Sequence, residues 1–253
     1  MTITIKSPQN PRLKTLKRLA TRRERERSGH FLVEGEDLVL AARAAGRVAV
    51  EGFRLAGCGL GESGFLDVEP ELLRAVSTLG SGTRVIGVYE QQWGEPTGPL
   101  CVYLHRVGDP GNVGTILRSA QAFGASCVAL GPGCADPHSP KAVRASMGAI
   151  FSVALARVSD VTELPGERVA LDARAAVPLS GEHASSLTLL VGAERDGLPA
   201  DVVDVCERSA RIPIASESLN AAMAATVALY EVTREDRARG GAIDPDSSRV
   251  RPS

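Results

Sequence analysis

Hydrophobic and polar positions along the chain form two successive blocks of strand-like and helix-like segments. The first block predicts helices and strands in alternation, with helices at 11–27, 37–46 and 70–79 and strands at 31–35, 48–56 and 83–90. The second block holds short apolar runs of the kind found in strands buried on both faces of a parallel sheet. These runs lie at 101–107, 126–131, 168–173, 187–192 and 210–214. Helices are expected between them, at about 112–123, 140–149, 199–207 and 218–236. The pattern predicts an α/β protein.

The segment 91–100 separates the two blocks, because it places two prolines and two glycines between patterned stretches. A chain of 253 residues can form one large domain or two modest ones, each with its own core. We expect two domains, at 1–95 and 100–236. The tail at 237–253 has little apolar content and is expected to be disordered.

Charge is distributed unevenly between the N-terminus and the rest of the chain. Residues 1–30 hold nine lysine and arginine residues against two glutamates, a charge of +7 that leaves −8 for the remainder of a chain whose total is −1. A basic segment on an otherwise acidic protein favours a polyanionic partner, nucleic acid first. A solvated, charged helix face is the alternative. Leu13, Leu16 and Leu19 recur at helical spacing, so the opposite face of this helix is expected to be buried.

Other features of the composition exclude several classes of protein. No apolar run approaches the length of a membrane span, and the N-terminus lacks the apolar stretch of a secretory signal, so we expect a cytoplasmic protein. The five cysteines contain no CxxC pair and the four histidines are scattered, which argues against a disulfide framework and a structural metal. GLGESG at 59–64 matches G-x-G-x-x-G, but the next helix begins only at Pro70, so we expect a surface loop.

Three segments of the second block place polar residues beside expected strand ends and helix starts. They read GDPGNVGTILRSAQAFGA at 108–125, LLVGAERDGLP at 189–199 and RIPIASESLNAAMAATVALYE at 211–231. In the first, Arg118 points away from the apolar stripe of its helix and Asn112 lies in the first turn. Taken alone, these residues fit a solvent-facing arginine and a helix cap.

The second and third segments suggest a ligand site and a buried helix. Gly192 and Ala193 end a strand, where small residues let backbone amides approach a ligand beyond the sheet. Glu194 fits a surface acid equally well, and Ser218 fits a helix N-cap. The helix after Ser218 is apolar almost all round, so we expect it to be buried in a core or a dimer seam.

These three segments resemble the motifs of the SpoU (SPOUT) family, RNA methyltransferases that use S-adenosylmethionine. The resemblance covers roughly residues 100–235 and extends more loosely to the N-terminus. It implies a C-terminal parallel-sheet methyltransferase domain with a trefoil knot, preceded by a small α/β RNA-binding domain, and a homodimer. It implies a catalytic set of Asn112, Arg118, Glu194, Ser218 and Asn220. It implies a cofactor-binding set of Leu190, Val191, Gly192, Ile212 and Leu219.

The N-terminal segment resembles the family's auxiliary RNA-recognition domain, which is similar to a ribosomal RNA-binding domain. SPKAVRASMGAIF at 139–151 resembles a family stretch near the active site, although a basic surface helix is an equally good interpretation; Ser146 there is a further candidate for RNA or cofactor contact. The residues implied to contact RNA are Arg12, Lys14, Lys17, Arg18, Arg22, Arg23, Lys141 and Arg144.

The resemblance implies 2′-O-methylation of a ribose in structured RNA, with ribosomal RNA favoured over tRNA because of the N-terminal domain. Positioning two bound reactants in line supplies much of such an acceleration. We expect a charged Arg118 to hold a phosphate and favour the developing alkoxide, while Asn112 and Ser218 align the hydroxyl. The alternatives are a tRNA ribose methyltransferase, a knotted base methyltransferase, and a non-catalytic RNA-binding or ribosome-assembly protein.

Overall fold

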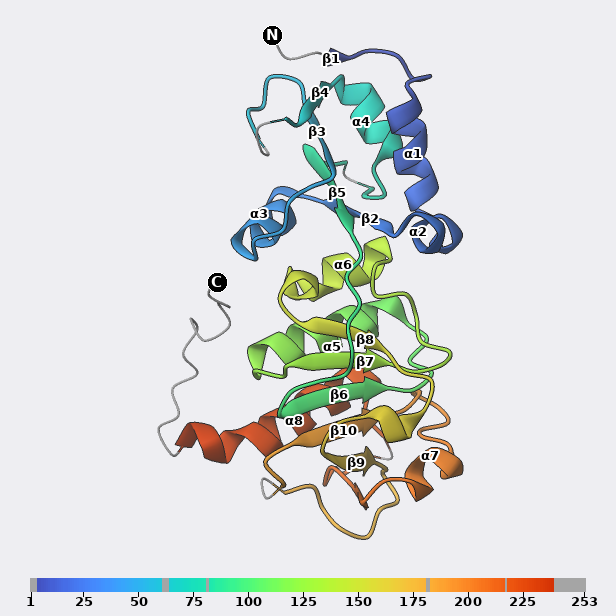
Figure 1. Cartoon of the computed structure of the whole chain (residues 1–253), viewed down its shortest axis with the longest axis vertical. Helices are drawn as coiled ribbons and strands as arrows, with labels where there is room; N and C mark the ends of the chain where they lie inside the picture. Colours follow the sequence, from blue (N-terminus) through green and yellow to red (C-terminus); the bar gives the residue numbers. More distant parts are fainter. Residues whose placement is uncertain (1–3, 61–63, 81, 181–182, 217, 239–253) are drawn as a thin grey trace. The chain divides into compact units, whose positions relative to one another are not determined.

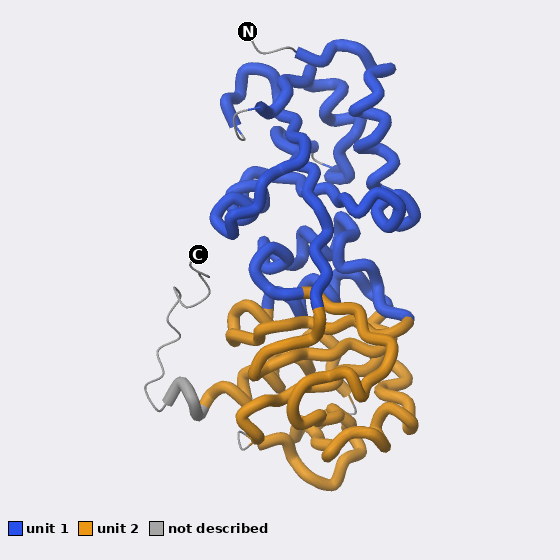
Figure 2. The backbone as a smooth tube through the Cα atoms, in the orientation of Figure 1, with its two compact units in different colours: residues 1–94, 108–118, 133–154 blue, residues 95–107, 119–132, 155–253 orange. Residues whose placement is uncertain are grey.

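The computed structural model describes residues 4–60, 64–80, 82–180, 183–216 and 218–238 (Figure 1). The chain divides into two compact units (Figure 2). Unit 1 comprises residues 1–94, 108–118 and 133–154, and unit 2 comprises residues 95–107, 119–132 and 155–253. The chain therefore enters unit 2 within the proline- and glycine-rich segment and then returns to unit 1 twice. The domain boundaries that the sequence suggests stay a prediction, and residues 239–253 of the expected tail lie outside the described part.

Unit 1 contains a five-stranded mixed sheet with the strand order β1-β4-β3-β5-β2. Its strands are β1 (Thr4–Ile5), β2 (His30–Glu34), β3 (Glu51–Leu55), β4 (Leu66–Val68) and β5 (Val85–Glu90). β4 runs parallel to β1 and β3, whereas β5 runs antiparallel to β3 and β2. The strands predicted near β2, β3 and β5 are confirmed. β1 and β4 were missed because two and three residues are too short to show a period.

Four helices of unit 1 come from its first segment: α1 (Pro11–Leu19), α2 (Arg22–Ser28), α3 (Glu36–Ala44) and α4 (Pro70–Val76). The single helix predicted at 11–27 is wrong, because the chain breaks at Ala20 and Thr21. Arg25 explains the break: its Nη1 donates to the carbonyl oxygens of Leu19 and Ala20, at 2.8 and 2.9 Å, and so satisfies the end of α1.

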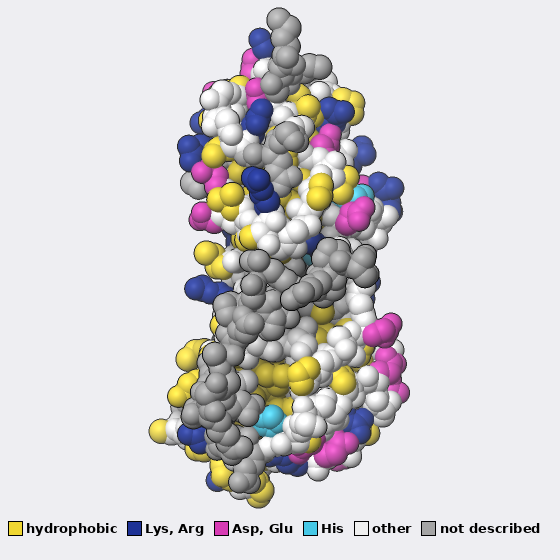
Figure 3. All heavy atoms as spheres, turned by 60° about the vertical axis from the view of Figure 1, so that its left-hand side comes forward, with side chains coloured by type: hydrophobic (Ala, Val, Ile, Leu, Met, Phe, Trp, Pro, Cys, Tyr) yellow, Lys and Arg dark blue, Asp and Glu magenta, His cyan; other side chains and the backbone are white. Residues whose placement is uncertain are grey.

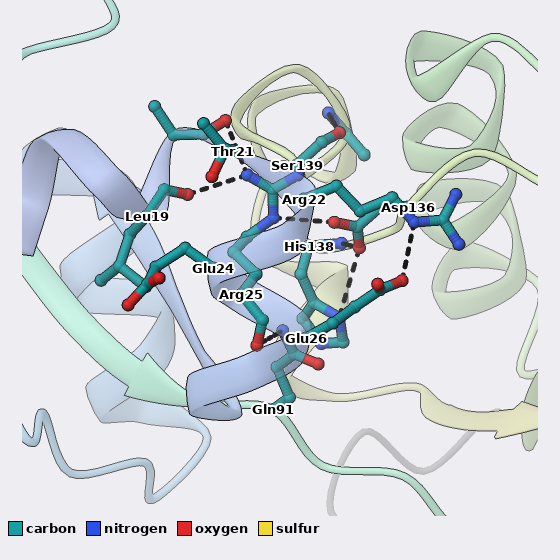
Figure 4. A network of polar contacts seen from close by, with 12 residues as sticks. Leu19, Thr21, Arg22, Glu24, Arg25, Glu26, Gln91, Asp136, His138 and Ser139 are labelled. Atoms are coloured by element: carbon teal, nitrogen blue, oxygen red, sulfur yellow. Dashed lines mark hydrogen bonds and ion pairs between the residues drawn. The ribbon is translucent and has the colours of Figure 1, made fainter.

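Arg25 also anchors α2 to a distant segment of the same unit. Its Nε lies 2.7 Å from Asp136 Oδ2, and the Arg25 side chain is only 4% exposed, so this ion pair is buried (Figure 4). Leu13, Leu16 and Leu19 are buried as predicted and join a core cluster with Phe53. α1 thus faces the core with its leucines and α2 with Arg25, whereas most of their other cations are exposed.

Unit 1 also takes up the start of α5 (Pro110–Ala122), the helix α6 (Pro140–Ser146) and the 3₁₀ turn η1 (Ala149–Phe151). α6 packs against β2, and the Phe151 ring lies 5.3 Å from that of Tyr89. α6 confirms the helix predicted at 140–149, shortened at its C-terminus. The glycine-rich segment 59–64 falls partly outside the described residues, so its interpretation as a surface loop stays a prediction.

Unit 2 contains a six-stranded sheet with the order β11-β9-β10-β6-β7-β8. Its strands are β6 (Leu100–Leu104), β7 (Cys127–Leu130), β8 (Ala154–Arg157), β9 (Glu167–Leu171), β10 (Leu187–Val191) and β11 (Arg208–Ala210). The strands from β11 to β7 run parallel to their neighbours. Every residue of β6, β7 and β10 is buried, as the apolar runs predict. β8 was not predicted.

The helices of unit 2 include α7 (Ala200–Asp204) and α8 (Ala221–Ala238), and α8 packs along β10. Within one chain α8 is not buried all round, so burial in the core of a single chain is excluded, and burial in a dimer seam stays a prediction. Ala225 and Leu229 face the core, but Met223, Val227 and Tyr230 are 56%, 40% and 53% exposed. Small alanines on one face allow close packing on the sheet, which leaves the larger apolar side chains on the other. Within the described ranges, no helix is long and apolar enough to cross a membrane.

Candidate active site

A cavity of about 410 Å³ opens at the carboxyl ends of three neighbouring strands of unit 2. Its lining residues come from the ends of β9, β10 and β11 and from the segments that follow, at 171–174, 191–198 and 210–224. Ligands of parallel α/β sheets bind at this edge, where the loops that follow the strands converge. A cavity of this size accommodates a nucleotide-sized molecule.

The loop after β10 is a tight turn closed on itself. The Gly197 N–H donates to the Ala193 carbonyl oxygen at 3.0 Å, and Gly197 adopts a φ of +66°, which favours glycine. At Gly192 an added Cβ would lie 2.2 Å from the Gly197 carbonyl carbon. The close contact between Gly192 and Gly197 therefore leaves no room for a side chain at residue 192. A glycine is needed here for the turn itself, apart from any ligand that binds nearby. Glu194 lies at the exposed tip of this turn.

The residue that caps the N-terminus of α8 differs from the one that the sequence suggests. Asn220 Oδ1 accepts hydrogen bonds from the N–H groups of Ala222 and Met223, at 2.9 and 3.3 Å. Asn220 is therefore the N-cap of α8, and the interpretation of Ser218 as the cap is wrong. Ser218 and Leu219 lie before the cap and line the cavity, together with Ala221 and Ala224 of α8 itself.

Four of the five residues implied to bind the cofactor line the cavity: Val191, Gly192, Ile212 and Leu219. The side chain of the fifth, Leu190, is fully buried in the core of unit 2 and faces away from this lining. The segment Leu171–Arg174 also lines the cavity and was not predicted. The sequence could have indicated this segment, because it follows the predicted strand β9. β9 pairs in parallel with β10, so the carboxyl ends of the two strands lie at the same edge of the sheet.

The implied catalytic residues divide between the two units. Glu194 and Ser218 line the cavity in unit 2, and Asn220 caps α8 beside it. Asn112 and Arg118 lie on α5 within unit 1. The Asn112 N–H donates to Asp109 Oδ1 at 3.0 Å, so Asp109 is the residue that caps α5. A common site formed by all five residues stays a prediction.

Arg118 forms no hydrogen bond or ion pair within the described part of the chain, and it is exposed. An exposed guanidinium keeps its five donors available for a phosphate or carboxylate. The geometry of α5 thus leaves Arg118 able to bind an anionic ligand.

The implied RNA contacts fall into two groups. Four are already engaged: Arg12 pairs with Glu51, Arg22 with Glu26, Lys141 with Asp109, and Arg144 donates to Thr78 Oγ1. The hydrogen bond from Lys141 lowers the pKa of Asp109, and the hydrogen bond to Glu26 raises the pKa of Arg22. The others form no ion pair with any described residue: Lys14, Lys17, Arg18 and Arg23. Figure 3 shows lysine and arginine side chains distributed over the surface of unit 1 in that view.

Fold and site together define a class of protein: an α/β protein with a small-molecule cavity at the carboxyl edge of a parallel sheet, joined to a unit with exposed cations. Residues 99–230 match the SpoU rRNA Methylase family, and residues 10–93 match the MRM3-like substrate binding domain. The chain belongs to the SpoU rRNA methylase family.

Individual relatives match over nearly the whole chain. A protein of Synechocystis named as an uncharacterized tRNA/rRNA methyltransferase is 31% identical, with 91% of this chain and 93% of the relative covered. The 23S rRNA (guanosine(2553)-2′-O)-methyltransferase RlmP of Bacillus subtilis is 29% identical, with 90% and 98% covered. The crystal structure of an AdoMet-bound rRNA methyltransferase from Sinorhizobium meliloti superimposes with a TM-score of 0.82 at 29% identity, covering 92% of this chain and 98% of that one.

Proposed function

We propose that this protein transfers a methyl group from S-adenosylmethionine to a ribose 2′-hydroxyl of ribosomal RNA. The cavity at the carboxyl edge of the parallel sheet carries this proposal, because two distant motifs of the family, at 189–199 and 211–231, meet there. Two relatives support the finer statement: RlmP is named as a 23S rRNA 2′-O-methyltransferase, and the Sinorhizobium enzyme binds AdoMet.

The cavity lining fits S-adenosylmethionine in its chemistry. Apolar side chains such as Leu198 and Ile212 suit an adenine ring, and charged side chains such as Asp172 and Arg174 suit hydroxyl, amino and carboxylate groups. When bound, this cofactor supplies a methyl group activated by a sulfonium. Val191, Gly192 and Leu219 would hold it, since they line the same cavity and match the family's cofactor residues.

The protein's own residues would act mainly by positioning the acceptor ribose. Arg118 is exposed and without an assigned partner among the described residues, so it would hold a phosphate of the target nucleotide and favour the alkoxide that develops at the 2′-oxygen. Asn112, Ser218 and Glu194 would align the hydroxyl and orient the guanidinium. Asn220 would contribute indirectly, because its side chain caps α8 and thereby places Ser218.

A map of ribose methylation tests the proposal directly. Total RNA from cells with and without the gene is compared position by position, and we expect one 2′-O-methyl group of ribosomal RNA to disappear with the gene. The wild-type gene should restore it and an Arg118→Ala variant should not. A change confined to tRNA, or a methylated base in the nucleosides, would contradict the proposal in favour of the alternatives. Calorimetric titration with S-adenosylmethionine that detects no binding would favour a non-catalytic protein.

We propose further that the protein is a homodimer in which α8 packs against a second copy. Met223, Val227 and Tyr230 form an exposed apolar stripe on α8 at helical spacing. The Tyr230 ring is held edge-on against Phe123, with ring centroids 6.3 Å apart, so the stripe is preorganised. Sedimentation equilibrium should give the mass of two chains for the wild type and of one for Val227→Lys. A wild-type monomer would contradict the proposal.

The trefoil knot and the cytoplasmic location are also proposed. The knot follows from family membership. Mechanical extension should end short of the full contour length if a knot tightens. The cytoplasmic location follows from the expected ribosomal RNA substrate, and cell fractionation should recover the protein there.

A further inference from the structure

Asp172 is the most shielded carboxylate in the cavity of unit 2. Among the described residues, three acids line this cavity: Asp172, Glu194 and Asp196. Glu194 and Asp196 lie in the exposed turn after β10, whereas Asp172 directly follows β9 and its side chain is only 24% exposed. A ligand in the cavity therefore meets Asp172 away from bulk water, where hydrogen bonds to a carboxylate are stronger than at the surface.

Hydrogen bonds within unit 2 fix the position of the Asp172 carboxylate. The Asp172 N–H donates to the carbonyl oxygen of Ala210 in β11, at 3.1 Å. Asp172 Oδ1 accepts hydrogen bonds from the N–H and the Nε of Arg174, at 2.9 and 3.4 Å. The Ala175 N–H donates to the Asp172 carbonyl oxygen at 3.1 Å, which closes the turn. The carboxylate is thus held in place before any ligand binds.

The second carboxylate oxygen of Asp172 is left to the ligand. Oδ2 accepts no hydrogen bond from any residue that the structure describes. An ionised carboxylate only accepts hydrogen bonds, and a partly buried one is costly to leave unsatisfied. A ligand that displaces water from Oδ2 therefore has to replace the hydrogen bonds of that water with donors of its own.

The degree of exposure distinguishes between the donors that S-adenosylmethionine offers. Besides its adenine amino group, the cofactor carries a charged α-ammonium and two neutral ribose hydroxyls. An ammonium is costly to remove from water, so the exposed turn with Glu194 and Asp196 suits it better than Asp172 does. Hydroxyls are less costly to bury, and an acidic residue hydrogen-bonds the ribose hydroxyl in other nucleotide-binding parallel sheets.

We propose that Asp172 binds the ribose hydroxyls of S-adenosylmethionine through Oδ2. The inference rests on the proposed function and identifies the part of the cofactor that this residue recognises. Asp172 and the residues that hold it all belong to unit 2. The role is one of binding, so loss of the Asp172 carboxylate should raise the KM for the cofactor and leave kcat at saturating cofactor unchanged.

Calorimetric titration of Asp172→Asn tests the proposal. Asparagine keeps an oxygen for the turn and replaces Oδ2 by an amide nitrogen, which accepts no hydrogen bond. Affinity for S-adenosylmethionine should fall at least tenfold. Affinity for 5′-methylthioadenosine, which retains the ribose but lacks the amino acid, should fall by a similar factor. A methylthioadenosine without the two ribose hydroxyls should bind the wild type and Asp172→Asn within twofold of each other.

Asp160→Asn is the matched control for this variant. Asp160 Oδ1 accepts a hydrogen bond from the Thr162 N–H at 2.9 Å, in the same kind of turn, and Asp160 does not line the cavity. This control should bind all three ligands within twofold of the wild type. Thermal unfolding of both variants separates a loss of ligand contact from a loss of folding.

Several outcomes would overturn the proposal. Wild-type affinity of Asp172→Asn for S-adenosylmethionine would show that Oδ2 contacts no cofactor group. A loss seen with S-adenosylmethionine but not with methylthioadenosine would assign Asp172 to the ammonium. A melting temperature far below that of Asp160→Asn, with equal losses for all three ligands, would assign Asp172 a structural role. A wild-type protein that does not bind S-adenosylmethionine would overturn the proposed function itself, which distinguishes the two failures.

Discussion

At the scale of single residues, Gly192 is the position where one added carbon should disturb the cavity most. Gly192→Ala places a Cβ 2.2 Å from the backbone of Gly197, so the turn at 193–197 must shift. We expect affinity for S-adenosylmethionine to fall at least tenfold and stability by about 1–3 kcal/mol, as for overpacked sites. Calorimetric titration and urea unfolding measure both. Gly94→Ala is the matched control, since nothing lies within 4 Å of its added Cβ.

Glu207 predicts a dependence of stability on pH. Hydrogen bonds from the Arg168 side chain and backbone lower the pKa of Glu207 to about 2. A lowered pKa stabilises the fold above the unfolded value, and that contribution is lost as pH falls from about 4.5 toward 2. The Glu207 side chain is 45% exposed, so Glu207→Gln should cost only about 1 kcal/mol at pH 7. Urea unfolding should show the cost shrinking at pH 3, whereas exposed Glu163→Gln should change little at either pH.

At the scale of elements, the crossing of α5 and α6 depends on Gly114. Glycine within a helix usually destabilises it, so Gly→Ala is normally favourable by about 1 kcal/mol. Here an added Cβ would lie 2.3 Å from the Ala142 carbonyl oxygen. We expect Gly114→Ala to destabilise the protein by about 1–3 kcal/mol and to reduce methyl transfer, because α5 carries Arg118. Thr115→Ala, at an exposed position of the same helix, should leave both properties near wild type. An unchanged Gly114→Ala would contradict this account.

At the scale of the whole molecule, the exposed cations of α1 and α2 should make RNA affinity depend on salt. Phosphate contacts release counterions, so each lost contact lowers both affinity and its salt slope. Lys17→Glu combined with Arg18→Glu should weaken ribosomal RNA binding at least tenfold at low salt and flatten the slope. Affinity for S-adenosylmethionine should not change. Arg43→Glu, an exposed cation of α3 outside the implied set, is the control, and an equal effect there would contradict a localised RNA surface.

Sequence periodicity predicted the elements that have a long apolar pattern. It failed where a single side-chain contact determines where a helix begins or ends. The buried strands β6, β7 and β10 are confirmed, because parallel strands covered on both faces read as continuous apolar runs. The break between α1 and α2 was missed, since it depends on Arg25, whose partner Asp136 lies more than a hundred residues away. The sequence suggested Ser218 as a possible cap of α8, whereas the cap is Asn220, because both residue types cap helices and only geometry separates them.

By itself, the sequence determined the α/β class, the order of most elements, the three polar motifs and the basic N-terminus, because periodicity and local charge are properties of neighbouring residues. Only the tertiary structure decided that Leu171–Arg174 joins Gly192 and Ser218 around one cavity, that half of the implied RNA cations are already paired, and that α8 leaves an apolar stripe exposed. These features arise from contacts between residues far apart in the chain, which no local pattern records.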